Sequence, residues 1–280
     1  MISYIGGKAK MSDWIGKFIP ENIDTYVEVF GGAFWVYING RIHERKSLDR
    51  IIYNDFNKFM VNLFECCRSP EEFSFRIRKI KDQDPLRFRT FQDHINKIKE
   101  EEFEIGNFDL AIMYSYLATQ VFSGSKIMES KFIDLKGKHI SKFSTFRKRL
   151  GSEKVRNKLR KITKCENLDY SDLIKKYDTP GTFFYVDPPY WKTENYYSNH
   201  EFDRGDHEKL CKQLSRIKGK FALSYYDFDL LDQWLPRDQY SWERKAYSKC
   251  AAAKKGKKQN RGVEVLIMNY KNKQLKLFTN

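Results

Sequence analysis

Residues 182–186 form an unbroken apolar segment that runs directly into Asp187, Pro188, Pro189 and Tyr190. The segment reads Thr-Phe-Phe-Tyr-Val, and its aromatic and β-branched residues are typical of a buried strand. Proline cannot donate to a β-ladder and it restricts the residue before it, so the strand is predicted to end at Asp187. In an open α/β sheet, that carboxyl edge is where ligands bind. The alternative is a tight turn in which Asp187 only caps a backbone group.

The polar groups of this short motif suit methyl transfer to the exocyclic amine of a nucleobase. The amine of adenine is a poor nucleophile because its lone pair is delocalised into the ring. The Asp187 carboxylate and the Pro188 carbonyl can each accept one N–H and draw the nitrogen toward tetrahedral geometry. The prolines hold these acceptors in place before the reaction, and Tyr190 offers a ring face on which a flipped base can stack.

The Asp-Pro-Pro-Tyr motif resembles the catalytic motif of amino-methyltransferases that use S-adenosylmethionine, and the surrounding pattern is similar to that of the DNA adenine methylase (Dam) family. The resemblance covers residues 1–57 and 165–280. It implies a discontinuous catalytic domain over these two ranges, with an α/β, Rossmann-like methyltransferase sheet and helices on both faces. Residues 58–164 would be an inserted, mainly helical target recognition domain, with a hairpin around residues 123–138. The implied catalytic residues are Asp187, Pro188, Pro189 and Tyr190.

The bulk properties indicate a globular and basic protein. At 280 residues the chain can bury a full core, and its 41% apolar content excludes a disordered chain. The formal charge of +15 points to an anionic partner, nucleic acid first. The five cysteines lack metal-binding spacing and are interpreted as reduced thiols in a cytoplasmic protein without a zinc site. With no signal peptide and no apolar run of membrane length, a soluble protein is expected.

Residues 25–38 are predicted to form a strand, a glycine turn and a helix, the first such unit of a nucleotide-type fold. Glycines in the turn allow the backbone to approach a ligand. Free amides at the helix start attract an anion such as the methionine carboxylate of the cofactor. The acid at the strand end can hold the methionine ammonium. The predicted cofactor residues of this unit are Glu28, Phe30, Gly31, Gly32 and Ala33.

The resemblance also assigns residues outside this unit to the S-adenosylmethionine site. An amino-terminal Gly-Gly-Lys stretch, an acid after a strand at residues 50–53, and an acid-aromatic pair at residues 169–170 are similar to the family's pattern. For the acids at positions 55 and 169, the alternative is an N-cap of the following helix. The residues implied are Tyr4, Lys8, Asp55, Asp169, Tyr170 and the shared Asp187.

Between residues 58 and 164 the composition changes to charged helical segments, predicted over residues 70–80, 86–99 and 108–122. Lysines and arginines then crowd residues 136–161, where Glu153 alone carries the opposite charge. Solvated helix faces normally mix both signs, so this run is interpreted as phosphate contacts. A basic loop predicted over residues 245–262 is interpreted in the same way. The predicted DNA-binding residues are Lys126, Lys138, Lys142, Arg147, Arg149, Lys255, Lys258 and Arg261.

These features predict a site-specific DNA methyltransferase that transfers a methyl group from S-adenosylmethionine to the N6 amine of a flipped adenine in double-stranded DNA, as a monomer and without a metal. The recognition sequence stays open, because residues 122–126 read Phe-Ser-Gly-Ser-Lys and do not match the family's GATC-reading loop. The presence of a partner nuclease also stays open. Two alternatives remain: methylation of an N4-cytosine or RNA-base amine, and an inactive nucleic-acid-binding protein of the same fold.

Overall fold

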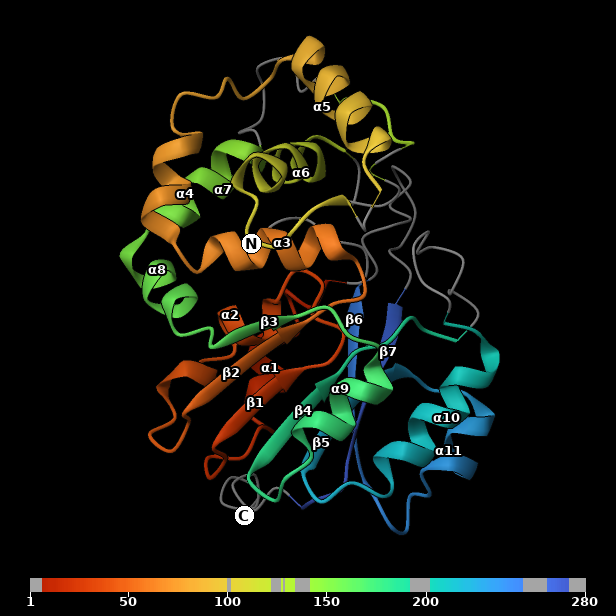
Figure 1. The fold of residues 1–280 in the computed structure, drawn as a ribbon. Helices are drawn as coiled ribbons and strands as arrows, with labels where there is room; N and C mark the ends of the chain where they lie inside the picture. Colours follow the sequence, from red (N-terminus) through yellow and green to blue (C-terminus); the bar gives the residue numbers. More distant parts are fainter. Residues whose placement is uncertain are drawn as a thin grey trace.

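One seven-stranded sheet organises the described part of the chain, which comprises residues 7–99, 102–121, 127, 129–133, 142–191, 202–248 and 261–271 of a computed structural model. The strand order is β3-β2-β1-β4-β5-β7-β6 (Figure 1). The strands are β1 (Thr25–Glu28), β2 (Arg50–Asn54), β3 (Lys164–Glu166), β4 (Thr182–Val186), β5 (Lys220–Tyr226), β6 (Ser241–Ser248) and β7 (Arg261–Met268).

The strands from β3 to β5 pair in parallel, whereas β7 runs antiparallel to both β5 and β6. The strand order reverses between β1 and β4, because β2 and β3 lie on one side of β1 while β4 and β5 lie on the other. Such a reversal is a topological switch point, and it leaves a ligand crevice at the carboxyl ends of the two strands. The motif at residues 187–190 follows β4 and therefore lies at this crevice.

Both faces of the sheet are buried, because successive residues of its central strands point to opposite sides. Tyr26 and Phe183 pack in the core on one face, with α1 (Ser12–Gly16), α2 (Trp35–Asn39) and α3 (Lys58–Cys67). Val27 and Phe184 pack on the other face, with α9 (Tyr170–Tyr177), α10 (Arg204–Leu214) and α11 (Asp229–Trp234). The predicted α/β sheet with helices on both faces is confirmed.

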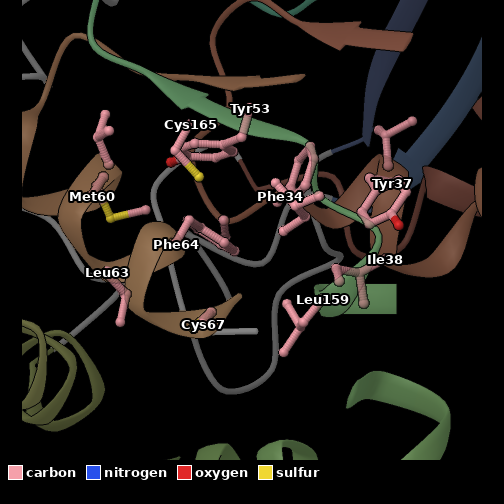
Figure 2. Packing of buried hydrophobic residues seen from close by; sticks show 14 of the residues in the cluster. Phe34, Tyr37, Ile38, Tyr53, Met60, Leu63, Phe64, Cys67, Leu159 and Cys165 are labelled. Atoms are coloured by element: carbon pink, nitrogen blue, oxygen red, sulfur yellow. The ribbon is translucent and has the colours of Figure 1, made fainter. Parts of the chain in front are cut away.

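Aromatic packing joins α3 to the sheet (Figure 2). The ring centroid of Phe64 lies 4.4 Å from that of Tyr53 and 5.6 Å from that of Phe34. Phe34 has a positive φ of 57°, a conformation that costs a non-glycine residue roughly 1–2 kcal/mol. Its fully buried ring offsets this strain, so these contacts fix the turn that leads into α2.

The chain between β2 and β3 forms a helical layer at one end of the sheet (Figure 1). Phe73 contacts Phe108 and Phe146, with ring centroids 5.9 Å apart in each pair, and so joins three of the helices. The helices predicted in this region are confirmed, with ends shifted by a few residues. A separate recognition role for residues 58–164 stays a prediction. After α3, the layer consists of α4 (Pro70–Ile77), α5 (Pro85–Lys97), α6 (Phe108–Gln120), α7 (Lys142–Gly151) and α8 (Glu153–Arg160).

The predicted loop over residues 245–262 is wrong at both of its ends. Residues 245–248 complete β6 and residues 261–262 begin β7, and the two strands pair from Ser241 with Met268 to Ser248 with Arg261. Charged side chains are common on an edge strand such as β6, because they discourage pairing with other chains, and here they obscured the strand pattern. Most of the predicted hairpin at 123–138 lies outside the described residues, and residues 129–133 are not in a strand.

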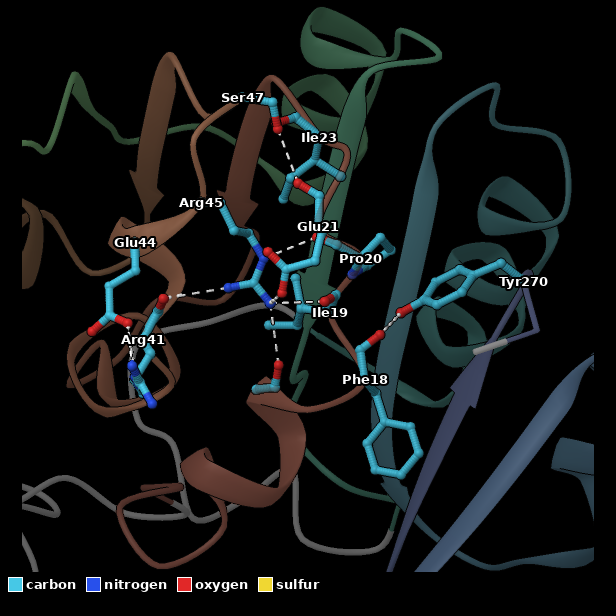
Figure 3. A network of polar contacts seen from close by, with 11 residues as sticks. Phe18, Ile19, Pro20, Glu21, Ile23, Arg41, Glu44, Arg45, Ser47 and Tyr270 are labelled. Atoms are coloured by element: carbon cyan, nitrogen blue, oxygen red, sulfur yellow. Dashed lines mark hydrogen bonds and ion pairs between the residues drawn. The ribbon is translucent and has the colours of Figure 1, made fainter. Parts of the chain in front are cut away.

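A buried arginine in the segment before β2 holds the end of α1 and the turn after it (Figure 3). Arg45 is 8% exposed, and its guanidinium donates to the carbonyls of Gly16, Ile19 and Pro20 at 3.2, 2.7 and 2.9 Å. These carbonyls lie in and just after α1, so the arginine holds the end of that helix and the turn after it. The Tyr270 hydroxyl donates to the carbonyl of Phe18 at 2.8 Å and anchors the same turn from the segment after β7.

We expect Arg45→Met to lower the free energy of unfolding by about 2–4 kcal/mol, because it leaves several buried carbonyls without their donor. Arg41→Met is the matched control, since the Arg41 side chain is 77% exposed and pairs at the surface with Glu44. It should change the free energy of unfolding by less than about 0.5 kcal/mol. Denaturant titration measures both values, and equal losses in the two variants would contradict the anchoring role.

Candidate active site

Asp187 stands at the carboxyl end of β4 and is held by a lysine from the amino-terminal segment. The Lys8 Nζ lies 2.8 Å from Asp187 Oδ1, and the side chains of Lys8 and Asp187 are 8% and 17% exposed. A turn links Lys8 to the start of α1, because its carbonyl accepts from the amides of Met11 and Ser12, each at 2.8 Å. The sequence predicted both residues for the site, and the structure brings them into direct contact.

A second carboxylate and an aromatic ring complete this cluster. Glu264 of β7 accepts a hydrogen bond from the Tyr190 hydroxyl, and its Oε1 lies 3.5 Å from Lys8 Nζ. The same ammonium lies 4.6 Å from the centroid of the Tyr190 ring. Two carboxylates, one ammonium and one phenol therefore meet in a largely buried place.

Burial has the largest effect on the pKa values of the acidic groups in this cluster. It raises the pKa of Asp187 above its usual range, while the Lys8 ammonium acts in the opposite direction. Burial also raises the pKa of Glu264, again against the effect of Lys8, and it raises the pKa of Tyr190. The ammonium thus opposes the effect of burial on the pKa of both carboxylates.

Glu28 lies on the other side of the switch point, at the end of β1. It pairs in register with Tyr185, and because residues two apart on a strand share a face, Glu28 and Asp187 lie on the same face of the sheet. Glu28 Oε1 accepts a long hydrogen bond of 3.4 Å from the amide of Tyr37. Its buried Oε2 has no hydrogen-bond partner among the described residues, and burial raises the pKa of Glu28. A buried carboxylate of this kind is ready to accept a ligand donor.

The glycine turn after β1 is fastened to the end of β2. The amide of Gly31 donates to the carbonyl of Asn54 at 2.6 Å, and the amide of Gly32 donates to Asp55 Oδ2 at 2.7 Å. Gly32 has a positive φ of 47°, which glycine adopts easily. Two of the amides predicted to receive the cofactor are therefore used inside the protein, and the roles of Gly31, Gly32 and Ala33 toward a ligand stay predictions.

The two acids for which an N-cap role was the alternative, Asp55 and Asp169, differ in the structure. Asp55 is not the N-cap of α3: that position belongs to Asn57, whose side chain accepts from the amide of Met60 at 3.2 Å. Asp169 does cap α9, because its Oδ1 accepts from the amide of Ser171 at 2.8 Å. The predicted cofactor roles of Asp55 and Asp169 stay predictions.

Two predicted aromatic residues lie together beside the crevice. The Phe30 and Tyr170 rings are stacked with centroids 5.8 Å apart, and Phe202 meets both rings edge-on. Asn54 holds the chain segments that carry Phe30 and Tyr170, since its side-chain amide donates to the carbonyls of Val29 and Leu168 at 2.9 and 3.2 Å. Asn54 thereby ties the ends of the three neighbouring strands to one another.

Sequence reasoning missed Glu264 and Asn54. Glu264 had a detectable signal, because it is the one acid in the apolar strand at residues 263–268 and a buried charge requires a partner. Asn54 had a weaker signal, since an asparagine at a strand end also suits an ordinary turn.

A cavity of about 310 Å³ opens next to the aromatic end of the motif. The ring of Tyr226, one of its walls, lies 4.4 Å from the Tyr190 ring between centroids and is nearly perpendicular to it. Aromatic and acidic side chains dominate the lining, a composition that suits a flat heterocycle with hydrogen-bond donors. The cavity is lined by Trp191, Tyr226, Asp227, Phe228, Asp229 and Leu230.

Three of the predicted DNA-binding residues, Lys142, Arg147 and Arg149, have partners within the protein. Arg147 pairs with Asp82 at 2.5 Å, the Arg149 guanidinium lies 4.9 Å from the Trp35 ring centroid, and Lys142 donates to the carbonyl of Val121. Other basic residues of the same run, Arg156 and Arg160, pair with Glu71 of α4. The acidic partners, Asp82 and Glu71, lie in earlier segments of the chain, so the charges within residues 136–161 alone did not reveal them.

Several predicted site residues lie outside the described residues. Arg261 is described only as the first residue of β7, and DNA contact by it and by Lys142, Arg147 and Arg149 stays a prediction. Among the described residues, no group of three or more His, Cys, Asp or Glu side chains is placed to hold a metal ion. In the same part of the chain, none of the helices combines the length and apolarity needed to cross a membrane. The predicted residues outside the description are Tyr4, Lys126, Lys138, Lys255 and Lys258.

The sheet, the switch point and the acid-proline-proline-tyrosine motif define a Rossmann-like methyltransferase domain. The family model of the D12 class N6 adenine-specific DNA methyltransferases matches residues 4–274, so the chain belongs to this family. Membership implies a methyl donor. The resemblance to adenine-specific DNA methyltransferases that the sequence motifs suggested is thereby confirmed.

Curated relatives include restriction-modification methylases. The chain is 27% identical to the type II methyltransferase M.FokI of Planomicrobium okeanokoites over 97% of its own length and 43% of that protein. It is 27% identical to modification methylase LlaI of Lactococcus lactis subsp. lactis over 80% of its length and 36% of the relative. The corresponding values for modification methylase StsI of Streptococcus sanguinis are 28%, 71% and 29%. The chain thus spans less than half the length of these relatives.

We expect Gly31→Ala to lower the free energy of unfolding by about 3 kcal/mol, because its Cβ would lie 2.3 Å from Tyr53 Cε2 and 2.6 Å from the carbonyl oxygen of Asn54. Gly151→Ala at the end of α7 is the control, since a Cβ there meets nothing within 4 Å. Thermal unfolding should show a large loss for the first variant and little change for the second. A stable Gly31→Ala variant would mean that β2 does not hold the turn as described.

Proposed function

We propose that this chain transfers a methyl group from S-adenosylmethionine to the N6 amine of an adenine flipped out of double-stranded DNA. The observation that carries the proposal is the position of Asp187, at the carboxyl end of β4, beside the switch point and next to Tyr190. Family membership supports the choice of adenine N6, and the formal charge of +15 supports an anionic polymer as substrate.

In this mechanism the residues of the motif act as fixed hydrogen-bond acceptors. Asp187 and the carbonyl of Pro188 accept the two N–H groups of the amine, so that its lone pair is directed at the methyl group. Burial of Asp187 strengthens this interaction because water does not compete well there. Tyr190 provides the stacking surface, and its hydroxyl is held by Glu264. The surplus proton leaves to water.

The residues near the switch point fit S-adenosylmethionine. When bound, this cofactor supplies a methyl group that its positively charged sulfur makes electrophilic. The unpartnered Oε2 of Glu28 is a suitable acceptor for the cofactor ammonium. Asp55 keeps acceptor capacity for ribose hydroxyls, because each carboxylate oxygen accepts more than one hydrogen bond. Phe30, Asp169 and Tyr170 are the proposed contacts of the cofactor adenine, and the stacking of Phe30 with Tyr170 next to Asp169 supports this assignment.

We also propose that the protein works in the cytoplasm as a monomer and modifies DNA within a restriction-modification pair. The relatives named modification methylases support this pairing. The cysteines that the structure describes, at positions 66, 67, 165 and 211, are free thiols, as expected for a reducing compartment. The helical layer at residues 58–164 is the proposed reader of the DNA sequence, with phosphate contacts from α7 and α8.

We expect Asp187→Asn to reduce methyl transfer by at least about 100-fold while the protein still folds, because the amide offers one acceptor and a competing donor. Asp172→Asn on the exposed face of α9 is the control, since it only loses a surface pair with Lys175. The variants are expressed in a methylation-free host, whose DNA is then read by single-molecule sequencing and digested to nucleosides. Methylation by Asp187→Asn at the wild-type level would refute the mechanism, and a methylated cytosine would refute the choice of base.

We expect Glu28→Gln to weaken the binding of S-adenosylmethionine about tenfold or more, because a charged acceptor of the ammonium contributes about 1.5–3 kcal/mol. Glu44→Gln is the control, since Glu44 is an exposed residue that pairs with Arg41. Isothermal titration calorimetry on the purified variants provides both dissociation constants. Unchanged binding by Glu28→Gln would show that the cofactor ammonium lies elsewhere.

A further inference from the structure

The acceptor that the proposed mechanism needs is already engaged in the structure. Lys8 Nζ lies 2.8 Å from Asp187 Oδ1, and an ammonium–carboxylate contact is stronger than one from a neutral amine. An adenine amine that approached Asp187 would therefore compete with a charged donor. Asp187 accepts the amine more strongly if the ammonium shifts toward another carboxylate, because the charged donor then no longer competes for the same oxygen.

Glu264 provides such an acceptor within reach. Its Oε1 lies 3.5 Å from Lys8 Nζ, so a small rotation of the flexible lysine side chain brings the ammonium into direct contact. Glu264 is 2% exposed, and burial makes an ion pair with Lys8 stronger than it would be at the surface.

The backbone keeps Glu264 fixed during such an exchange. It lies in β7, where it pairs in register with Tyr226 of β5 and with Lys245 of β6. Strand residues paired on both sides move little, so the carboxylate is a stationary acceptor. The Tyr190 hydroxyl, which also donates to Glu264, orients the stacking ring from the same point.

We propose that Glu264 is a positioning residue that accepts the Lys8 ammonium when the target amine binds Asp187, and that it holds Tyr190 in place for the stacked base. This inference rests on the proposed function and extends it to a residue of the last core strand. The exchange keeps the charge of the cluster constant, because the ammonium passes from one carboxylate to the other and no proton is transferred.

The test is a double-mutant cycle between Glu264 and Lys8 in the full chain. A duplex with one recognition site is designed from the motif that host sequencing gives for the wild type. We expect Glu264→Gln to raise the KM for this duplex about tenfold or more, because Lys8 then stays on Asp187. In the Lys8→Met background the same change should raise KM less than about twofold, because the competing ammonium is absent. Glu264→Asp, which keeps the charge, should recover much of the loss.

A second measurement does not need turnover. Binding of a duplex that carries 2-aminopurine in place of the target adenine is followed by fluorescence, and this base has no amine at position 6. Glu264→Gln should weaken binding of the adenine duplex and leave that of the aminopurine duplex within about twofold of the wild type. Glu243→Gln on the neighbouring strand β6, where Glu243 pairs with Leu266, is the control and should change neither binding nor KM.

The outcomes separate this inference from the function on which it rests. If the wild type methylates no DNA, the proposed function fails and the inference with it. If the wild type methylates DNA and Glu264→Gln lowers activity equally with and without Lys8, Glu264 has only a structural role. A wild-type KM for Glu264→Gln also overturns the inference. Circular dichroism melting of each variant shows whether a loss of activity reflects unfolding.

Discussion

The parallel pairing of β1 with β4 is the constraint on which the rest of the structure depends. Its register sets Glu28 against Tyr185, which places Glu28 and Asp187 on one face of the sheet at the point where the strand order reverses. A slip by one residue would turn one of the two carboxylates to the opposite face. Aromatic and aliphatic side chains packed on both faces of the sheet then support this pairing.

Buried charge is concentrated where the chemistry is proposed, and it is balanced by contributions from distant parts of the chain. Lys8 comes from the amino-terminal segment, Asp187 from the middle of the sheet and Glu264 from its last strand. Each charge alone would destabilise the fold, whereas together they form a paired cluster. The Arg45 contacts have a supporting role, because they fix the turn after the helix that follows Lys8.

The sequence was sufficient for the features that depend on local pattern. The strand that ends at Asp187, the glycine turn after Glu28 and the helices between β2 and β3 each have a clear periodicity or a stop signal, and the structure confirms them. Features that depend on contacts between distant residues were not visible. The pairing of Arg156 and Arg160 with Glu71 and the bond between Tyr190 and Glu264 join residues far apart in sequence. Position 31 shows both cases. The sequence predicted that the turn needs a glycine there, but it did not reveal that a Cβ would collide with the neighbouring Tyr53 ring.

The antiparallel insertion of β7 between β5 and β6 also affects how the protein matures. Because Glu264 enters the cluster only when this strand docks, a nascent chain still on the ribosome already carries Lys8 and Asp187 but lacks their second acid. Contacts across such a long sequence separation form late in folding. Assembly of the buried charge cluster is therefore tied to completion of the sheet.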